Sequence, residues 1–256
     1  MRIVRYRGTD GPAWGIVGAG DRVRAIGADP FTDHEPGVDV GSLGELELLA
    51  PAAPSTLICV GRNYREHAAE FDNPVPDEPL LFLKPPSSII APGAKIHYPA
   101  LSGRVDPEAE LAIIIGREAH RLPAERAMEV IGGFTCANDV TARDIQKSDG
   151  QWTRGKGFDT FCPLGPWIET DLDPGDLRVT CTVDGEIRQD GRTSDLIFPI
   201  PYLIEYISRF TRLMPGDLVL TGTPAGVAPI EVGQTVVVEV EGIGRLENRM
   251  VNEPAA

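Results

Sequence analysis

One stretch of the chain combines apolar and polar positions in an unusual way. Residues 104–116, RVDPEAELAIIIG, end in a continuous apolar run of the kind that forms a buried strand. Acidic residues open this run, and in a strand the side chains of Glu108 and Glu110 would share one face, about 6.5–7 Å apart. The pattern therefore predicts a buried strand that carries two carboxylates into one end of the core.

Other apolar segments predict further strands and a few helices. Strands are expected in STLICVG, PLLFL, GFTCAN, LRVTCTV, EIRQDG, DLVLTG and QTVVVEV, and the Asp-Gly pair at 184–185 is typical of a hairpin turn. Helices are expected in REHAAEF, LPAERAMEVIGG and IPYLIEYISRFTRL. The residues predicted to form the buried face of the last helix are Leu203, Ile204, Ile207 and Phe210.

Strands dominate this pattern, and no regular alternation of strands with helices is visible. It therefore favours an α+β fold with a mixed, mostly antiparallel sheet. We expect a small N-terminal β-rich segment over residues 1–50 and a larger domain over residues 55–252. Each of the four separated cysteines has apolar or small neighbours, which predicts reduced thiols in the core.

Composition changes this picture mainly through charge. Asp and Glu number 38 against 24 Lys and Arg, which gives a net charge of −14. Such a surface repels nucleic acid and anionic membranes, and no apolar run approaches the roughly 20 residues of a membrane span. We expect a cytoplasmic protein, in which a small anionic substrate would need a local cationic pocket or a metal ion.

The two glutamates need compensation if they are buried. Carboxylates this close cannot both stay ionised without a proton, a cationic side chain or a metal ion nearby. Asp139, in ANDVTARD, is a third carboxylate at a point where an apolar strand turns polar. Hard oxygen ligands favour Mg²⁺, Mn²⁺ or Ca²⁺ over zinc. The alternative is that Glu108 and Glu110 lie on a solvated face with Arg104 as their counterion.

A histidine and a glutamate three residues apart indicate proton-transfer chemistry. His67 and Glu70 would share a helix face, and a carboxylate bonded to one imidazole nitrogen leaves the other nitrogen free to accept a proton. The alternative is an ordinary surface pair. Lys84 and Lys156, in apolar or glycine-rich surroundings, could meet an anionic substrate or a developing oxyanion.

Two further polar elements could hold an anionic substrate. Arg143 offers a planar fork that can bind a carboxylate through two hydrogen bonds. The hydroxyls and backbone N–H groups of TGTPAG, residues 221–226, could cradle a carboxylate. This segment lacks the GxxxxGK[ST] pattern of a phosphate-binding loop, and a plain turn is its simplest interpretation.

Taken together, these residues resemble the fumarylacetoacetate hydrolase family. The matching segments, in the family's order over about residues 55–250, are LICVGRNYREHAAE, PLLFLKPPSSII, DPEAELAIIIG, GFTCANDVTARD, RGKGFDTFCPLGPW and MPGDLVLTGTPAGV. The resemblance implies a mixed β-roll with few helices and a homodimer. It also implies an Mg²⁺ or Mn²⁺ site formed by Glu108, Glu110 and Asp139.

The resemblance also implies roles for the remaining candidate residues. His67 and Glu70 would be a catalytic dyad on a segment that closes over the substrate, and Lys156 would be a catalytic lysine of the pocket. The residues expected to bind substrate are Arg62, Lys84, Arg143 and Thr223.

Several reactions are compatible with these expectations. The first is hydrolysis of a C–C bond in a small 2-oxo acid such as an acylpyruvate or fumarylpyruvate, through a metal-bound enolate, as in the breakdown of aromatic compounds. The alternatives on the same site are isomerisation of 2-hydroxyhepta-2,4-diene-1,7-dioate and decarboxylation of oxaloacetate-like acids. A remote alternative is an inactive member that serves as a binding or scaffold protein. The short segment before the shared core disfavours fumarylacetoacetate itself as the substrate.

Overall fold

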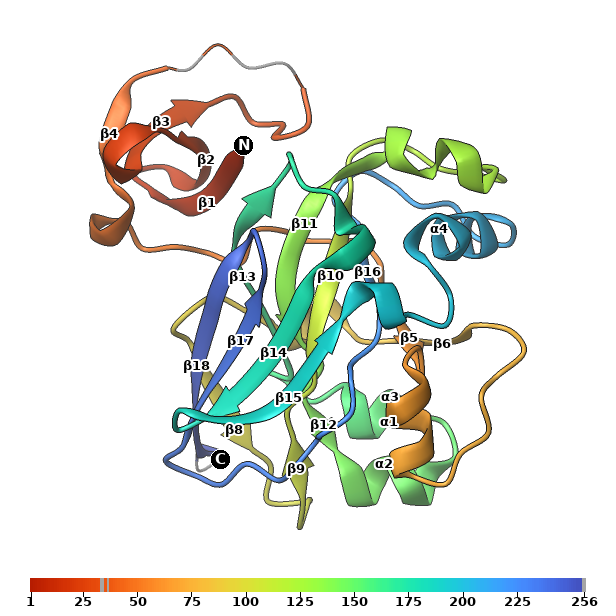
Figure 1. Ribbon diagram of the computed structural model, residues 1–256. Coiled ribbons are helices and arrows are strands. Elements are labelled where there is room, and N and C mark those ends of the chain that lie inside the picture. Colours follow the sequence, from red (N-terminus) through yellow and green to blue (C-terminus); the bar gives the residue numbers. More distant parts are fainter. Residues whose placement is uncertain (33–34, 36, 255–256) are drawn as a thin grey trace.

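The computed structural model describes residues 1–32, 35 and 37–254 and contains two packed sheets (Figure 1). Neighbouring strands of the larger sheet follow the order β4 (Asp39–Ser42), β3 (Arg22–Ile26), β2 (Gly11–Val17), β1 (Arg2–Gly8), β13 (Cys162–Glu169), β11 (Ile131–Asn138), β10 (Ala109–Ile115), β16 (Leu218–Leu220), β5 (Leu57–Gly61) and β6 (Leu80–Leu83), with β7 (Ile89–Ile90) paired to β13. The second sheet follows the order β15 (Glu186–Arg192), β14 (Arg178–Val183), β17 (Thr235–Val240), β18 (Gly244–Asn252) and β8 (Lys95–Tyr98).

Most strand pairs are antiparallel. The pairs β5–β16, β7–β13 and β8–β18 are parallel, so the sheets are mixed. A two-stranded ribbon joins β9 (Val105–Asp106) to β12 (Thr141–Ala142) just below the ends of β10 and β11. The predicted α+β fold, mixed and mostly antiparallel with few helices, is confirmed.

The helices are short and lie outside the sheets. The α-helices are α1 (Arg65–Glu70), α2 (Arg143–Asp149), α3 (Thr153–Lys156) and α4 (Ile200–Ser208). The 3-10 turns are Ala19–Asp21, Leu43–Glu45, Pro86–Ser88, Ala124–Glu129, Pro174–Asp176 and Thr193–Asp195. Helices α1, α2 and α3 gather near one end of the large sheet (Figure 1).

Strand β10 is buried on both faces, which explains its continuous apolar sequence. Ile113 packs in the cluster between the sheets, together with Val179 and Val238 of the second sheet. Ile114 points to the opposite face and packs in a separate cluster with Leu57 of β5. Burial of each of these side chains contributes roughly 1.5–3 kcal/mol. The strand that carries the glutamates is therefore held firmly from both sides.

Two predicted helices differ from expectation. Within residues 122–133, expected to form one helix, Ala124–Glu129 forms a 3-10 turn and β11 begins at Ile131. Helix α4 ends at Ser208. Phe210, expected on the buried face, is 66% exposed, so that prediction was wrong. The reason is a competing contact, because the chain leaves the helix so that Leu213 can exchange two backbone hydrogen bonds with Ala119. The ring of Phe210 meets the Tyr206 ring edge-on.

The N-terminal strands extend the large sheet. Strand β1 pairs with β13 through Arg2 opposite Glu169 and Ile3 opposite Ile168. Strands β1–β4 also enclose a small apolar cluster that includes Val4 and Val23. They form the red and orange lobe at the upper left of Figure 1, whereas α1–α3 lie at the lower right.

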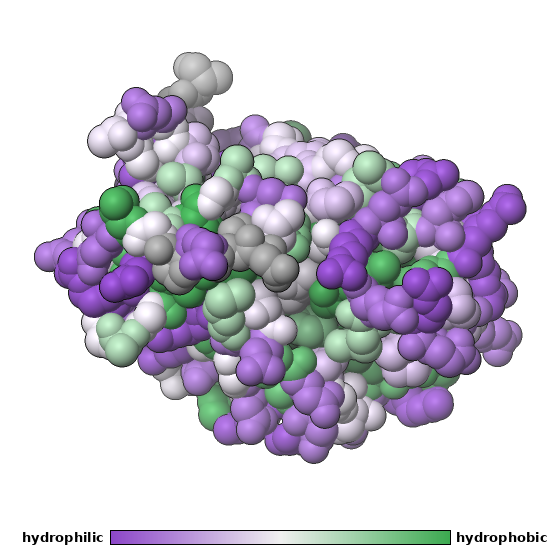
Figure 2. Space-filling model, turned by 90° about the horizontal axis from the view of Figure 1, so that it is seen from above, coloured by the Kyte–Doolittle hydropathy of each residue, from purple (hydrophilic) through white to green (hydrophobic). Residues whose placement is uncertain are grey.

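The surface is largely hydrophilic, as the net charge of −14 leads one to expect. Seen from above, apolar side chains form patches that hydrophilic side chains interrupt (Figure 2). Among the described residues, no helix has both the length and the apolar character to cross a membrane.

Candidate active site

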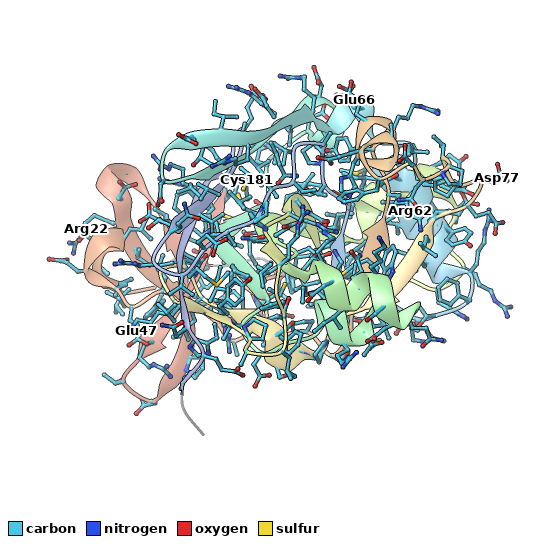
Figure 3. The ribbon with its side chains drawn as sticks, turned by 90° about the horizontal axis from the view of Figure 1, so that it is seen from below. Arg22, Glu47, Arg62, Glu66, Asp77 and Cys181 are labelled. Carbon is cyan, nitrogen blue, oxygen red and sulfur yellow. The ribbon has the colours of Figure 1, made fainter. Side chains whose placement is uncertain are left out.

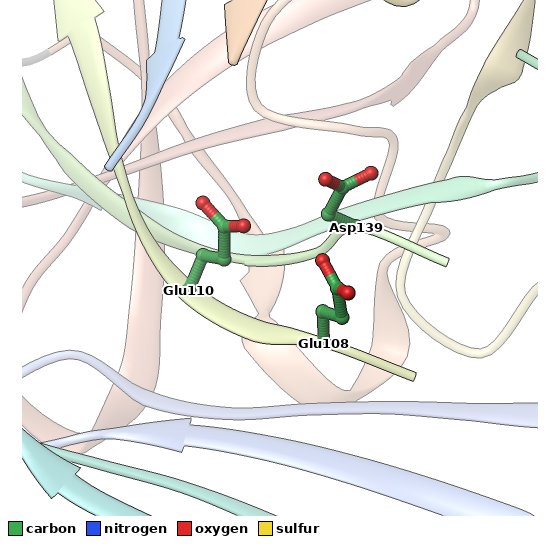
Figure 4. A group of neighbouring side chains, drawn as sticks. All are labelled: Glu108, Glu110 and Asp139. Carbon is green, nitrogen blue, oxygen red and sulfur yellow. The ribbon is translucent and has the colours of Figure 1, made fainter. Parts of the chain in front are cut away.

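Two neighbouring strands bring the three predicted carboxylates together. Glu110 lies on β10, Glu108 immediately precedes that strand, and Asp139 immediately follows β11. The antiparallel register places Ala109 opposite Asn138, and the Asp139 amide donates to the Glu108 carbonyl at 2.9 Å. One carboxylate oxygen from each acid lies within 4.8 Å of the others, and all three point into one space (Figure 4).

This carboxylate group is buried. Glu108, Glu110 and Asp139 are 3%, 2% and 1% exposed, so the alternative of a solvated face is wrong. Arg104 is not the counterion of the two glutamates. Its guanidinium instead donates two hydrogen bonds of 3.0 Å to the carboxylate of the fully buried Asp106.

Cationic side chains compensate two of the three carboxylates. The Lys156 ammonium donates to Glu108 and Asp139 at 2.6 Å each, and Lys84 donates to Asp139 at 2.6 Å. Arg143 donates to Glu108 at 2.6 Å. Burial opposes ionisation of Glu108, but Lys156 and Arg143 outweigh burial and hold its pKa below the usual value. The same carboxylates outweigh burial at Lys156 and raise the pKa of its ammonium.

Glu110 has a different environment. Its carboxyl accepts the Gly222 backbone N–H at 2.6 Å, and no cationic side chain of the described residues lies within ion-pair distance. Burial, followed by the charges of Asp139 and Glu108, raises the pKa of Glu110 well above its usual value. A further positive charge at this point would favour the ionised form of Glu110.

The predicted histidine–glutamate pair is formed at the same end of the sheet. The turn after β5 leads into α1, where the His67 Nδ1 lies 3.2 Å from Glu70 Oε2. The Gly226 backbone N–H donates to the other Glu70 oxygen at 3.2 Å, which fixes the carboxylate. Burial lowers the pKa of His67, against the opposing effects of Glu108 and Glu70. The imidazole is therefore neutral at pH 7 and able to accept a proton.

A cavity of about 570 Å³ connects these groups, a volume suited to a small molecule. Of the sequence-predicted residues, those that line it are Arg62, His67, Glu108, Glu110, Asp139, Arg143, Lys156 and Thr223. Glu70 lies behind His67, and Lys84 lies behind Asp139, where it also donates to the Val140 carbonyl at 3.2 Å. The Thr223 hydroxyl donates to the Ala109 carbonyl at 2.8 Å.

Sequence reasoning missed several residues that shape this cavity. Asp106 also accepts a hydrogen bond of 2.9 Å from Arg143, and Gln146 accepts one of 2.8 Å from the same guanidinium. Gln146 could have been found from its spacing, since it follows Arg143 by three residues on α2. Trp152 lines the cavity and carried no comparable signal. Gln189 donates to the Thr223 hydroxyl at 2.7 Å from a distant strand.

The carboxylate group could hold a divalent metal ion. Three carboxylates supply the hard oxygen donors that Mg²⁺ and Mn²⁺ prefer. The Lys156 ammonium, shared between Glu108 and Asp139 at 2.6 Å, shows that this point in the fold attracts a cation. Glu110, with its raised pKa and no cationic partner in the described part of the chain, would be the remaining ligand of such an ion.

The fold and the site define an α+β protein with a buried acidic centre beside a histidine–glutamate pair. The chain belongs to the fumarylacetoacetate hydrolase family, because the family described as "Fumarylacetoacetate (FAA) hydrolase C-terminal" matches residues 56–251. A second family, described as "Rv2993c-like, N-terminal", matches residues 1–51. The protein is thus an enzyme of the fumarylacetoacetate hydrolase superfamily.

Solved structures and curated proteins resemble the chain over most of its length. A structure named 5-carboxymethyl-2-hydroxymuconate delta-isomerase, from Mycobacterium smegmatis, is 47% identical with a TM-score of 0.91, over 99% of this chain and 100% of that one. A 2-hydroxyhepta-2,4-diene-1,7-dioate isomerase from Mycobacterium marinum is 44% identical with a TM-score of 0.92, over 100% of both chains. Oxaloacetate tautomerase FAHD1 of Arabidopsis thaliana is 44% identical over 75% of this chain and 88% of its own length.

Proposed function

We propose that the protein is an isomerase or tautomerase that moves a proton between the 2-enol and 2-oxo forms of a small 2-oxo acid. The observation that carries this proposal is the placement of His67, a neutral base oriented by Glu70 at 3.2 Å, on the same cavity as the buried carboxylate group. The names of the similar proteins support proton transfer over C–C hydrolysis, the reaction first expected from the sequence.

The carboxylate group would bind Mg²⁺ or Mn²⁺ through Glu108, Glu110 and Asp139. When bound, the ion supplies Lewis acidity that lowers the cost of negative charge on the 2-oxygen of the substrate. In this proposal Lys84 orients Asp139 from behind and does not touch the substrate, since it does not line the cavity. Arg143 faces the cavity and binds the adjacent carboxylate of the substrate.

His67 transfers the proton between the 2-hydroxyl oxygen and carbon. The neutral imidazole removes the proton of the 2-hydroxyl, the O–H electron pair forms the C=O bond, and the C2=C3 electron pair takes a proton back from the imidazolium at carbon. The O–H bond and the C2=C3 π bond are thus exchanged for a C–H bond and the C2=O π bond, and no electrons are lost or gained overall. Lys156, which faces the cavity, stabilises negative charge that develops on oxygen.

This proposal is tested by following the ultraviolet absorbance of enol substrates. The enol of oxaloacetate and 2-hydroxyhepta-2,4-diene-1,7-dioate are offered with Mg²⁺ or Mn²⁺, and pyruvate release from acetylpyruvate is measured in parallel. Ion-dependent loss of enol absorbance without pyruvate release is the expected result. Pyruvate release from acetylpyruvate at a comparable rate would instead establish the hydrolase.

Replacement of the base should separate catalysis from folding. We expect His67→Gln to lower turnover of the enol substrate about 100-fold or more, because proton transfer by a positioned side chain contributes roughly 10²–10⁴. Glu66→Gln is the matched control, since Glu66 lies on the same helix but is exposed and does not line the cavity. Equal activity in the His67 variant and in this control would rule out the proposed base.

The pH dependence should report the buried imidazole. Burial lowers the pKa of His67 from its ordinary value of 6.5, and the protonated ring below that pKa cannot accept a proton. A nearby divalent ion would shift this pKa further in the same direction. We therefore expect the acid limb of kcat/KM to have its midpoint below pH 6.5, and to be absent in His67→Gln. A wild-type midpoint above that value would contradict the assignment.

A further inference from the structure

The loop that follows β16, residues 221–226 (TGTPAG), binds two carboxyl groups of the protein itself. The Gly222 backbone N–H donates to Glu110 at 2.6 Å, and the Gly226 backbone N–H donates to Glu70 at 3.2 Å. The sequence indicated that N–H groups of this loop could cradle a carboxylate, and these two do so within the chain. The loop therefore connects the acidic centre to the histidine–glutamate pair.

Both of these contacts depend on a glycine backbone. Gly222 and Gly226 each have φ of 101°, a conformation that side chains rarely allow. A Cβ on Gly222 would lie 2.7 Å from the Asn63 Cβ, and one on Gly226 would clash with the Arg188 carbonyl oxygen. The loop is therefore packed directly against the turn before α1 and against β15.

Helix α1 contacts this loop at both of its ends. Asn63, in the turn before α1, is fully buried and donates from Nδ2 to the Thr221 carbonyl at 2.8 Å. That carbonyl belongs to the same peptide group as the Gly222 N–H, which reaches the acidic centre. Glu70, the last residue of α1, accepts the Gly226 N–H. The orientation of α1 thus depends on the position of the loop.

The middle of the loop is bound by one fully buried side chain, Gln189 of β15. Its Nε2 donates to the Thr223 hydroxyl and to the Pro224 carbonyl, at 2.7 Å each. Its Oε1 accepts the backbone N–H of Ala109, between the two glutamates of the acidic centre, at 2.9 Å. An N–H can only donate and a carbonyl can only accept, so these partners fix which end of the carboxamide faces which group.

Gln189 reaches the site from the second sheet and does not line the cavity. Its partner across the β14–β15 pair is Cys181, which lies between Arg22 and Glu66 of α1 when the molecule is seen from below (Figure 3). Any effect of Gln189 on the reaction must therefore pass through the groups to which it is bonded. Its loss would leave a buried N–H and a buried carbonyl without their partner, so the loop would have to move.

We propose that Gln189 is a positioning residue for proton transfer, because it fixes the loop 221–226 and thereby orients the His67–Glu70 pair toward the acidic centre. This inference rests on the proposed function only in that His67 accepts a proton. Arg143, which binds the substrate in that function, is bonded to Asp106, Glu108 and Gln146, none of which belongs to the loop. Gln189 should therefore affect turnover more than substrate binding.

The test replaces Gln189 by methionine, which has a similar length and no strong hydrogen-bonding group. In Gln189→Met we expect kcat for the enol with Mg²⁺ to fall about 10- to 100-fold at a KM within a few-fold of wild type, since misplacement by about 1 Å can cost about 10² in rate. Gln234→Met is the matched control. The Gln234 carboxamide also binds a turn, through Asp184 and Glu231, but it lies outside the cavity lining.

A second comparison distinguishes positioning of the pair from a general structural effect. Residues that act through the same group have non-additive effects, so in the His67→Gln background Gln189→Met should lower kcat by less than about threefold. The full loss in that background would show that Gln189 acts by another route and would overturn the inference. Wild-type kcat in Gln189→Met, or an equal loss in Gln234→Met, would also overturn it.

Hydrogen exchange tests the contacts without any change at Gln189. In Glu70→Ala the Gly226 amide should exchange about tenfold faster than in the wild type, because it loses its acceptor, whereas the Gly222 amide should be unchanged. Equal exchange of the Gly226 amide in both proteins would overturn the inference, even if Gln189→Met did not fold.

The outcomes also separate this inference from the proposed function. Pyruvate release from acetylpyruvate by the wild type, with no consumption of the enol, would reject the tautomerase. The same variants would then be compared by pyruvate release, because His67 would accept a proton from water in that reaction. If the wild type catalysed neither reaction, the exchange of the Gly226 amide alone would decide whether the loop is bonded to the histidine–glutamate pair.

Discussion

In Glu110→Ala, divalent ions are expected to lose their stabilising effect and enol turnover to fall about 1,000-fold. Glu110 supplies the only carboxyl of the group that lacks a cationic partner in the described part of the chain, so an added ion depends on it most. Lewis-acid stabilisation is worth several kcal/mol, and each 1.4 kcal/mol corresponds to about tenfold in rate. The measurements are the shift in Tm with Mn²⁺ and the rate of loss of enol absorbance.

The fold should persist in this variant, because burial and the charges of Asp139 and Glu108 make the ionised Glu110 carboxylate unfavourable where it stands. Glu110→Gln tests the same point while it keeps an acceptor for the Gly222 N–H. Glu239→Ala, an exposed carboxylate on β17, is the matched control and should behave as the wild type. A full Mn²⁺-dependent shift in Tm after loss of Glu110 would place the ion elsewhere.

The second large effect is a loss of stability, expected when Lys156 is replaced by methionine (Lys156→Met). Its ammonium is buried and donates to Glu108 and Asp139 at 2.6 Å, so its loss leaves two buried carboxylates less compensated. Removal of one partner from a buried ion pair costs about 3–5 kcal/mol. In chelator, the free energy of unfolding in urea should fall by this amount, and Mn²⁺ should restore much of it by replacing the missing positive charge.

Arg154→Met on the same helix is the appropriate comparison. Arg154 pairs with Asp149, but its side chain is 59% exposed, and exposed pairs contribute about 0–1 kcal/mol. Equal stability of the Lys156 and Arg154 variants in chelator would show that Lys156 does not compensate the centre. Equal destabilisation of Lys156→Met with and without Mn²⁺ would show that the ion does not take over its charge.

Much of the central architecture could be predicted because it follows from short-range patterns. The apolar run at residues 109–115 predicted β10, and the two-residue period of a strand put Glu108 and Glu110 on one face. The three-residue spacing of His67 and Glu70 predicted their contact, which the structure forms at 3.2 Å. These features need only the local geometry of a helix or strand.

The partners across the fold could not be predicted in the same way. That Lys156 bridges Glu108 and Asp139 depends on how α3 packs against the ends of β10 and β11, which no local period encodes. The pairing of Arg143 with Asp106 likewise depends on the ribbon that brings β12 beside β9. Such contacts are set by tertiary packing, so the sequence alone did not predict which cationic side chain pairs with which buried carboxylate.

The acidic centre and the histidine–glutamate pair rest on different kinds of scaffold. Strands β10 and β11, whose adjoining ends carry the three carboxylates, are hydrogen-bonded along their length and covered on both faces, so changes there disturb the whole core. His67 and Glu70 instead occupy a six-residue helix in the connection between β5 and β6. A substitution in this connection should therefore alter proton transfer at little cost in stability, whereas one in β10 or β11 should cost stability and activity together.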